Sequence, residues 1–256
     1  MDLAIARSKS APVSIEELKN STTPMSSGRH YPIAHYDLYE EVMHSLEEAG
    51  AAVYSEQHAV SHDGSRYFGL LNLAPSDGAN TQFTMTVGLR NSHDKRFRAG
   101  ICFGNRVLVC DNLCFSGEAV IGRRHTRNIY RDLPRLVWQC VSQLNDHYEE
   151  TESRMTAYRQ RMLSGDEARA LTVRAVEGGV LPPSKILKVL AEFEEPTYPE
   201  HLEEDGGSLW TLQNAFTEVQ KGRNIFELPR TQETLKGLLD VTAGIVGGKK
   251  YTEVVG

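Results

Sequence analysis

The spacing of apolar residues divides the chain into an N-terminal part with mixed patterns and a C-terminal helical part. Between Pro32 and Gly50 the apolar positions recur at intervals of three and four, and Gly50 stands where the C-terminal cap of a helix is expected. Two β-prone runs then flank Asp63-Gly64, a dipeptide that adopts the positive φ angles of a tight turn. The pattern predicts one amphipathic helix followed by a β-hairpin.

Apolar and polar residues alternate over residues 83–90 and again over residues 97–103. Alternation is typical of a strand with one buried face and one face in solvent. Gly104-Asn105 is another tight-turn dipeptide, so residues 88–112 are predicted to run strand, turn, strand, turn, strand. Together with the hairpin, these segments predict an antiparallel sheet of about five strands, a hairpin plus a three-stranded meander.

The period becomes helical from Asp132 onward. Residues 132–163 have a candidate N-cap, an early proline and apolar residues at steps of three and four, which predicts one long helix. Four shorter helices are predicted over residues 166–177, 183–193, 208–221 and 231–243. We therefore expect an α+β fold: an N-terminal helix, an antiparallel sheet, a long helix and a helical C-terminal half.

Composition suggests how these elements group. Residues 1–30 are rich in serine and proline and predict a flexible N-terminal arm. Residues 31–165 are expected to form the α+β core domain, and residues 166–256 a helical C-terminal region. Within that region, the acidic, proline-containing residues 194–207 predict a solvated loop.

The overall composition is that of a globular protein, with 256 residues of which 40% are hydrophobic and 24% charged. No apolar run reaches the length of about 18 residues that could cross a bilayer, and the N-terminus lacks the apolar core of a secretory signal. We expect a cytoplasmic protein that has no membrane as a partner. The four cysteines are expected to remain thiols: Cys102, Cys110, Cys114 and Cys140.

Positive charge is concentrated in the middle of a chain whose formal net charge is -6. Residues 88–136 hold ten arginines and lysines against four acidic residues. Arginine binds phosphate oxygens bidentately and releases counterions, so such a segment favours a polyanion as partner. The candidate nucleic-acid-binding residues are Arg90, Lys95, Arg96, Arg98, Arg123, Arg124, Arg127 and Arg131.

A plainer interpretation is that these arginines form a solvated surface and pair with acidic residues of the C-terminal helices. Aromatic residues could stack on unpaired bases, among them Phe97, Phe103 and Tyr130. Phe97 and Phe103 share the parity of the apolar positions, however, which favours the core. The opposite strand face, with Arg90 and Arg98, is the better candidate for a ligand. The densest basic cluster is residues 122–131, between the sheet and the long helix.

The triplet Ser-His-Asp occurs twice, at residues 61–63 and 92–94. Consecutive residues point in different directions, whereas the members of a catalytic triad must converge. Ser and Asp are also common turn formers, so turn chemistry is the favoured interpretation. No phosphate-binding glycine loop is present, and we predict neither a catalytic residue nor a cofactor.

A metal site remains as an alternative, because histidines and aspartates are suitable ligands. A metal-dependent nuclease would use His62, His93, His125, Asp63 and Asp94. The cysteines form no C-x-x-C pair, so a closed zinc site is not expected. The favoured expectation is that the protein holds no metal.

Five segments carry a family resemblance: "SHDGSRYFGLLNL", "VGLRNSHDKRF", "RVLVCDNLCFSG", "RRHT" and "SLWTLQNAFTEVQKG". With them, the chain resembles a family of phage and plasmid proteins catalogued as a domain of unknown function. The resemblance implies a protein of a mobile element in a bacterial host cell. It brings no agreed catalytic residues.

The order of elements is also similar to that of phage single-strand annealing proteins. Those proteins bind single-stranded DNA along a positive groove and form rings or filaments, so the similarity implies a homo-oligomer that acts in recombination. Our first hypothesis is therefore a phage or mobile-element protein that binds single-stranded nucleic acid. The alternatives are the metal-dependent nuclease and a phage protein that binds a host protein through its acidic helical half.

Overall fold

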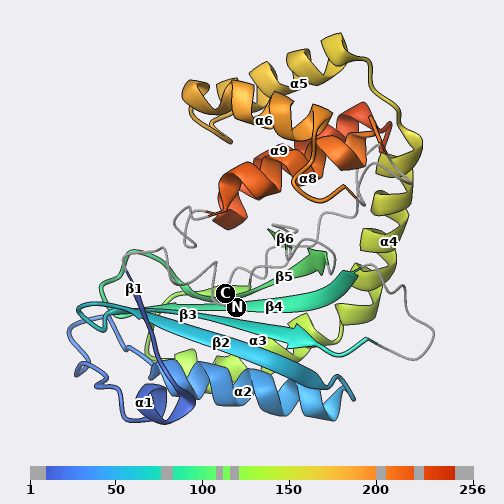
Figure 1. Cartoon of the computed structure of the whole chain (residues 1–256). Coiled ribbons are helices and arrows are strands. Elements are labelled where there is room, and N and C mark those ends of the chain that lie inside the picture. Colours follow the sequence, from blue (N-terminus) through green and yellow to red (C-terminus); the bar gives the residue numbers. More distant parts are fainter. Residues whose placement is uncertain are drawn as a thin grey trace.

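The computed structural model describes residues 10–75, 83–107, 112–115, 121–199, 206–221 and 228–245. At its centre is an antiparallel sheet of seven strands, in which β1 to β6 are neighbours in chain order (Figure 1). The free side of β5 is shared, because β6 pairs with its second half and β7 with its first half. The strands are β1 Ser10–Pro12, β2 Val53–Ser61, β3 Arg66–Leu73, β4 Phe83–Ser92, β5 Ala99–Val107, β6 Asn112–Phe115 and β7 Ile121–Arg123.

The helices form two layers. α2 and α3 lie against one face of the sheet, and α4 leads away from it to a second layer made of α5, α6, α8 and α9 (Figure 1). The bounds are α1 Ile15–Lys19, α2 His35–Glu48, α3 Ile129–Val141, α4 Leu144–Gln160, α5 Gly165–Glu177, the 3-10 helix η1 Pro183–Lys185, α6 Ile186–Glu194, α8 Leu209–Gln220 and α9 Leu228–Thr242.

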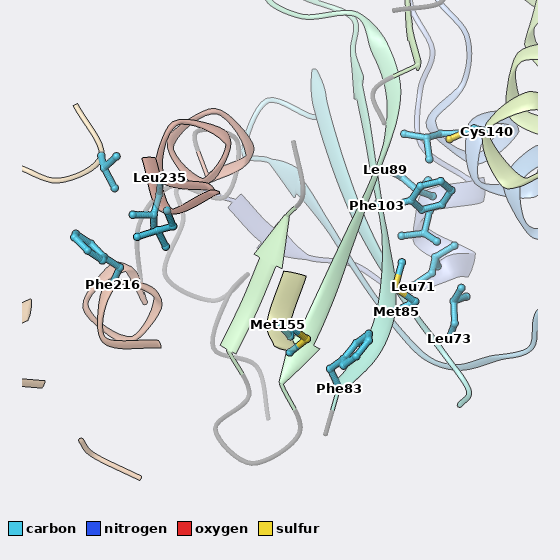
Figure 2. Packing of buried hydrophobic residues seen from close by; sticks show 14 of the residues in the cluster. Leu71, Leu73, Phe83, Met85, Leu89, Phe103, Cys140, Met155, Phe216 and Leu235 are labelled. Atoms are coloured by element: carbon cyan, nitrogen blue, oxygen red, sulfur yellow. The ribbon is translucent and has the colours of Figure 1, made fainter. Parts of the chain in front are cut away.

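Strand alternation builds the main core. Val87 and Phe103 are register partners on β4 and β5, and both are fully buried on the face that α2 and α3 cover. Figure 2 shows Leu89, Phe103 and Cys140 packed together on that side of the sheet, while Phe216 and Leu235 pack between α8 and α9 on the other side. Each layer of helices thus has apolar contacts of its own.

The α+β fold class predicted from the sequence is confirmed, and so are the helices expected over the C-terminal half. The sheet has seven strands instead of about five, because three short strands extend it. The turn predicted at Gly104-Asn105 is wrong: both residues lie inside β5, where Gly104 pairs with Thr86 and Asn105 with Met85. Ladder hydrogen bonds to β4 therefore override the local turn preference.

The polar face predicted for β4 is not in solvent. Thr84 and Thr86 are buried, and the Thr86 hydroxyl donates to the Asn72 side chain at 3.0 Å. Asn72 in turn donates to the Ser55 hydroxyl at 2.9 Å. Because the Thr86 and Asn72 side chains are hydrogen-bonded across the strands, they can be buried on the second face of the sheet. The buried Thr84 hydroxyl has no hydrogen-bond partner in the described structure.

The long helix predicted from Asp132 is two helices, α3 and α4, separated at Ser142 and Gln143. The Ser142 hydroxyl donates to the Gln139 carbonyl at 3.1 Å, and the Gln143 amide donates to the Cys140 carbonyl at 3.0 Å. These three-residue hydrogen bonds tighten and end α3. The apolar spacing continues across the break, so the sequence pattern alone predicts a single helix.

Residues 10–30 belong to the folded body, unlike the flexible arm predicted for them. β1 pairs with β2, and α1 begins with a capping box between Ser14 and Glu17. Leu18 of α1 is 1% exposed and packs in the main core. One buried leucine and a capped turn are enough to anchor a segment whose composition is otherwise that of a loop.

Candidate nucleic-acid interface

The β2–β3 turn and the β4–β5 turn lie side by side at one end of the sheet, since Arg66 pairs with Ser92 in the register of β3 and β4. Each turn contains a Ser-His-Asp triplet. Asp63 accepts a hydrogen bond from the Ser61 hydroxyl at 2.5 Å, and Asp94 accepts one from the Ser92 hydroxyl. The serine hydroxyls bond to aspartate within each turn, which agrees with the turn role predicted for both triplets.

Asp94 organises the basic residues around the β4–β5 turn. Its carboxylate accepts a hydrogen bond from Arg66 Nε at 2.8 Å and lies 3.5 Å from Arg96 Nε. Partial burial raises the pKa of Asp94, but hydrogen bonds from Ser92 and Arg66 outweigh it and the net pKa is lowered. The carboxylate is therefore charged at neutral pH and holds two guanidinium groups at this end of the sheet.

Lys95, at the tip of the same turn, has a strained backbone. Its φ of 67° makes it the one non-glycine residue in the described part of the chain with a positive φ. The left-handed region costs a residue with a side chain about 1–2 kcal/mol. The side chain itself is exposed. An exposed lysine at a position that favours glycine is a candidate for a functional residue.

β7 brings a second basic segment to the same end. Ala99 pairs with Arg123, and Gly100 pairs with Gly122. The Arg98 side chain lies across β7 at Gly122, where an added Cβ would approach the Arg98 Cδ to 3.1 Å. Glycine at this position thus leaves room for a guanidinium to cross the strand.

Two arginines share one carboxylate where β7 leads into α3. The Arg123 guanidinium lies 2.5 Å from Asp132, and Arg131 Nε lies 3.0 Å from the other carboxylate oxygen. Arg131 and Arg123 lower the pKa of Asp132. The Arg123 side chain is only 11% exposed, whereas that of Arg131 is 74% exposed. Arg123 therefore joins β7 to α3, while Arg131 stays open to a ligand.

Arg124 and Arg127 are exposed and, like Lys95, form no ion pair with any described residue. The arginines that do pair here use Asp94 and Asp132, which lie at the end of the sheet and in α3. Six accessible or half-buried cations come from the β4–β5 turn, the segment after β7 and the first turn of α3. We name these six the arginine rim: Lys95, Arg96, Arg98, Arg124, Arg127 and Arg131.

Arg90 lies outside the rim. It is half-buried with its guanidinium 5.8 Å from the centre of the Phe97 ring, and its Nε has no hydrogen-bond partner among the described residues. Phe103 is fully buried, as the strand parity predicts, and Phe97 is half-buried. The strand face that carries Arg90 is therefore less open to a ligand than the turns beside it.

Four histidines form a cluster next to the arginine rim: His30, His35, His93 and His125. The His35 and His93 rings stack at 4.1 Å, and the His30 and His125 rings lie 5.1 Å apart. His93 Nε2 donates to the Ile33 carbonyl at 2.8 Å. The cluster joins the segment before α2 to both turns and to the start of α3.

Three of these histidines, His35, His93 and His125, are neutral at pH 7. Burial, with a smaller effect of His93, lowers the pKa of His35 to about 3, and burial together with His30 and His93 lowers the pKa of His125 to about 4. Burial also lowers the pKa of His93. The His125 Nε2 atom is buried without a hydrogen-bond partner in the described structure. The positive charge of this end of the molecule thus comes from arginine and lysine.

The residues predicted for a nuclease do not come together as a metal site. His93 and His125 lie in the buried cluster, while His62 is exposed in the β2–β3 turn. Across the described ranges, no group of three or more histidine, cysteine, aspartate or glutamate residues is placed to bind a metal ion. Asp63 and Asp94 are instead bound by serine hydroxyls.

Cys102 and Cys140 are buried free thiols. Burial raises the pKa of Cys102 to about 12 and raises that of Cys140 as well, so neither is a nucleophile at neutral pH. Cys110 lies outside the described residues, and Cys114 lies in β6 with a side chain that is not described.

Three residues at this end of the molecule were not singled out from the sequence. Arg66 pairs with Asp94, and Arg29 is exposed beside His30. Trp138 is 59% exposed on α3, among positions that a helical wheel places with arginines. The only signal available for Trp138 was its place on the polar side of the helical pattern.

The family whose description reads "Domain of unknown function (DUF932)" matches residues 26–239, which include strands β2 to β7, the arginine rim and most of the helical layer. The chain belongs to this family. No curated protein and no solved structure matches the DUF932 chain. None of its described helices is both long enough and apolar enough to cross a membrane.

Proposed function

We propose that this protein binds single-stranded nucleic acid through the phosphate backbone at the arginine rim. One observation carries the proposal: Lys95, Arg124 and Arg127 are exposed without ion pairs in the described structure, and they come from two chain segments that β5 and β7 bring to one end of the sheet. When such unpaired surface cations bind phosphates, counterions are released, and this release favours binding.

The form of the rim favours a chain of phosphates over a single small anion. Its cations stand on the β4–β5 turn, on the segment after β7 and on the first turn of α3. A helix N-terminus adds a partial positive charge there. Cations spread over several surface elements match a polyanion, which presents phosphates at regular intervals.

The similarity to single-strand annealing proteins supplies the biological context of the proposal. In that context the protein acts as a homo-oligomer in recombination of a phage or another mobile element, in the cytoplasm of a bacterial host. The nuclease alternative lacks a metal site in the described part of the chain, so we carry forward the binding function alone.

The test is a fluorescence-polarisation titration with a labelled oligothymidylate at several salt concentrations. If the five most exposed rim residues each contact a phosphate, affinity should fall about 100-fold between about 50 and about 200 mM salt. The triple variant Lys95→Gln, Arg124→Gln, Arg127→Gln should bind more weakly and lower the salt slope by about 2.

The matched control replaces three exposed cations of the helical layer: Arg174→Gln, Lys188→Gln and Arg230→Gln. It changes the net charge by the same amount and should bind like the unaltered protein. Binding that does not respond to salt, or an equal loss in both triple variants, would contradict the proposal.

A further inference from the structure

The outer face of α3 combines an exposed tryptophan with arginines. The helix packs its inner face on the sheet and on α2 through Ile129, Leu133, Leu136, Val137 and Cys140. The opposite stripe has the spacing i, i+3, i+4, i+7 and consists of Arg131, Pro134, Arg135 and Trp138, all exposed. These four side chains lie next to one another on the helix surface.

Trp138 is unusual because 59% of a large apolar side chain faces solvent. The other tryptophan of the chain, Trp210, is 2% exposed in the core of the helical layer. A tryptophan exposed to water at the end of a polar stripe contributes little to folding and is typical of a binding surface. The packing of α3 leaves its indole face free.

Charge around Trp138 points to an anionic partner with flat apolar groups. The Arg135 guanidinium donates to the Gln139 amide oxygen at 3.3 Å, and Arg131 shares Asp132 with Arg123. Neither position adjacent to the indole is acidic. Single-stranded nucleic acid has both features, because its phosphates bind arginine and its unpaired bases stack on aromatic rings.

The stripe continues the arginine rim. Basic residues follow one another at steps of three and four from Arg124 through Arg127, Arg131 and Arg135, and Trp138 extends the series by three more. Tyr130, exposed at 54%, is not part of this stripe, because its hydroxyl bonds to the carboxylate of Asp37 on α2.

A membrane surface is the other partner that binds tryptophan and arginine on a helix. Insertion into a bilayer requires a broad apolar face, typically with leucine and phenylalanine. On α3 that broad face is already used by the core, and the outer stripe offers only Pro134, between two arginines, and Trp138 after them. The stripe therefore fits a nucleic-acid strand better than a lipid surface.

We propose that the outer face of α3 is a base-stacking platform, where Trp138 stacks on an unpaired base while Arg131 and Arg135 bind the adjoining phosphates. This inference rests on the proposed function and specifies it, because it selects single strands over duplexes. The bound nucleic-acid strand runs from the arginine rim along α3. Bases paired in a duplex cannot stack on the Trp138 ring, so the platform contributes only to single-strand binding.

Tryptophan fluorescence tests the platform in the full-length protein. Oligothymidylate should quench the emission of the unaltered protein, because a base stacks on the exposed Trp138. Inorganic polyphosphate, which binds the rim but has no bases, should leave the emission unchanged. In Trp138→Phe the remaining Trp210 is buried, so oligothymidylate should quench nothing. Trp138→Ala should weaken oligothymidylate binding about 10-fold or more and leave polyphosphate binding unchanged.

The possible failures are distinguishable. Salt-dependent binding of oligothymidylate without quenching, with unchanged affinity in Trp138→Ala, overturns the platform and leaves the proposed function standing. If neither oligothymidylate nor polyphosphate binds, the proposed function fails and the platform fails with it. Quenching by anionic phosphatidylserine vesicles, in the absence of any effect of oligothymidylate, would assign the stripe to a membrane surface and overturn the platform.

Discussion

Asn91 holds the histidine cluster together through all of its side-chain hydrogen-bonding groups. Its amide nitrogen lies 3.0 Å from the Ile33 carbonyl and 3.0 Å from His35 Nδ1, and its oxygen accepts from the Ser92 amide at 2.9 Å. His35 Nε2 then donates to the Gly64 carbonyl at 3.1 Å. Because each group is satisfied by a defined partner, a neutral imidazole is stable at this buried position.

The burial of these histidines makes stability depend on pH. An unfolded histidine has a pKa of about 6.5, whereas His35 has a pKa of about 3 and His125 of about 4 in the fold. Between these values the unfolded chain binds more protons than the folded one, so the free energy of unfolding decreases as the pH falls below 6.5. Above 6.5 both states are neutral and this contribution is fully present.

We expect His35→Gln to reduce this pH dependence. Removing one such group lowers the slope of the free energy of unfolding by up to about 1.4 kcal/mol per pH unit in the acid range. Urea unfolding at a series of pH values from neutral to about 4.5 measures it. The control is His44→Gln, which removes an exposed histidine of α2, and the slope should fall less in it than in His35→Gln. An unchanged slope in His35→Gln would show that the buried imidazole does not titrate as expected.

For individual residues, the sequence predicts the roles of serine and aspartate in the two turns but not the histidine cluster. The serine and aspartate positions in both triplets are local, and turn preference alone predicts their roles. His35 and His93 are 58 positions apart along the chain, and no local spacing indicates that their rings stack. Such a contact follows only from the register of β3 with β4 and the docking of α2.

Among the secondary-structure elements, those with local start and stop signals were predicted well. Gly50 ends α2 with a φ of 72°, and Ser164 begins α5 with a capping box to Glu167. The two-residue turn expected at Asp63-Gly64 is wrong, because the connection runs over residues 62–65 and only Gly64 of the dipeptide has a positive φ, of 66°. The short strands β1 and β7 were missed because only pairing with β2 and β5 holds them in place.

The junction of β7 with α3 couples folding to ligand binding. Asp132 neutralises Arg123 and Arg131, so it stabilises the junction and at the same time reduces the positive charge of the rim. Asp132→Asn should therefore lower the melting temperature, because the buried Arg123 loses its charged partner. It should also tighten oligothymidylate binding at low salt, with a salt slope steeper by about 0.7 for each freed guanidinium that reaches a phosphate.

Thermal unfolding and polarisation titration measure the two effects on the same variant. Asp166→Asn is the matched control, since Asp166 pairs with Arg169 on the exposed side of α5, away from the rim. It should change neither property appreciably. A variant of Asp132 that is both less stable and a weaker binder would indicate that the rim depends on the intact junction more than on its charge.

For the molecule as a whole, α4 joins the sheet layer to the helical layer. Met155 of α4 is 4% exposed within one continuous apolar core that includes residues of both layers. One turn along, the Tyr158 hydroxyl donates to Asp240 of α9 at 2.6 Å, and Arg154 Nε lies 3.0 Å from the same carboxylate. Apolar and polar contacts thus cross the boundary near residue 165 that the sequence predicted between two regions.

We expect these shared contacts to make unfolding a single cooperative transition. In the Trp138→Phe variant, the emission of the buried Trp210 reports on the helical layer, and far-ultraviolet circular dichroism reports on the whole chain; the two urea curves should coincide. Tyr158→Phe, which removes the hydroxyl bond to Asp240, should shift both curves together to lower urea, by about 1 kcal/mol. Separate midpoints for the two probes would instead mean that residues 31–165 and the helical C-terminal region are independent domains. In that case the sheet layer alone would hold a nucleic-acid strand bound along α3.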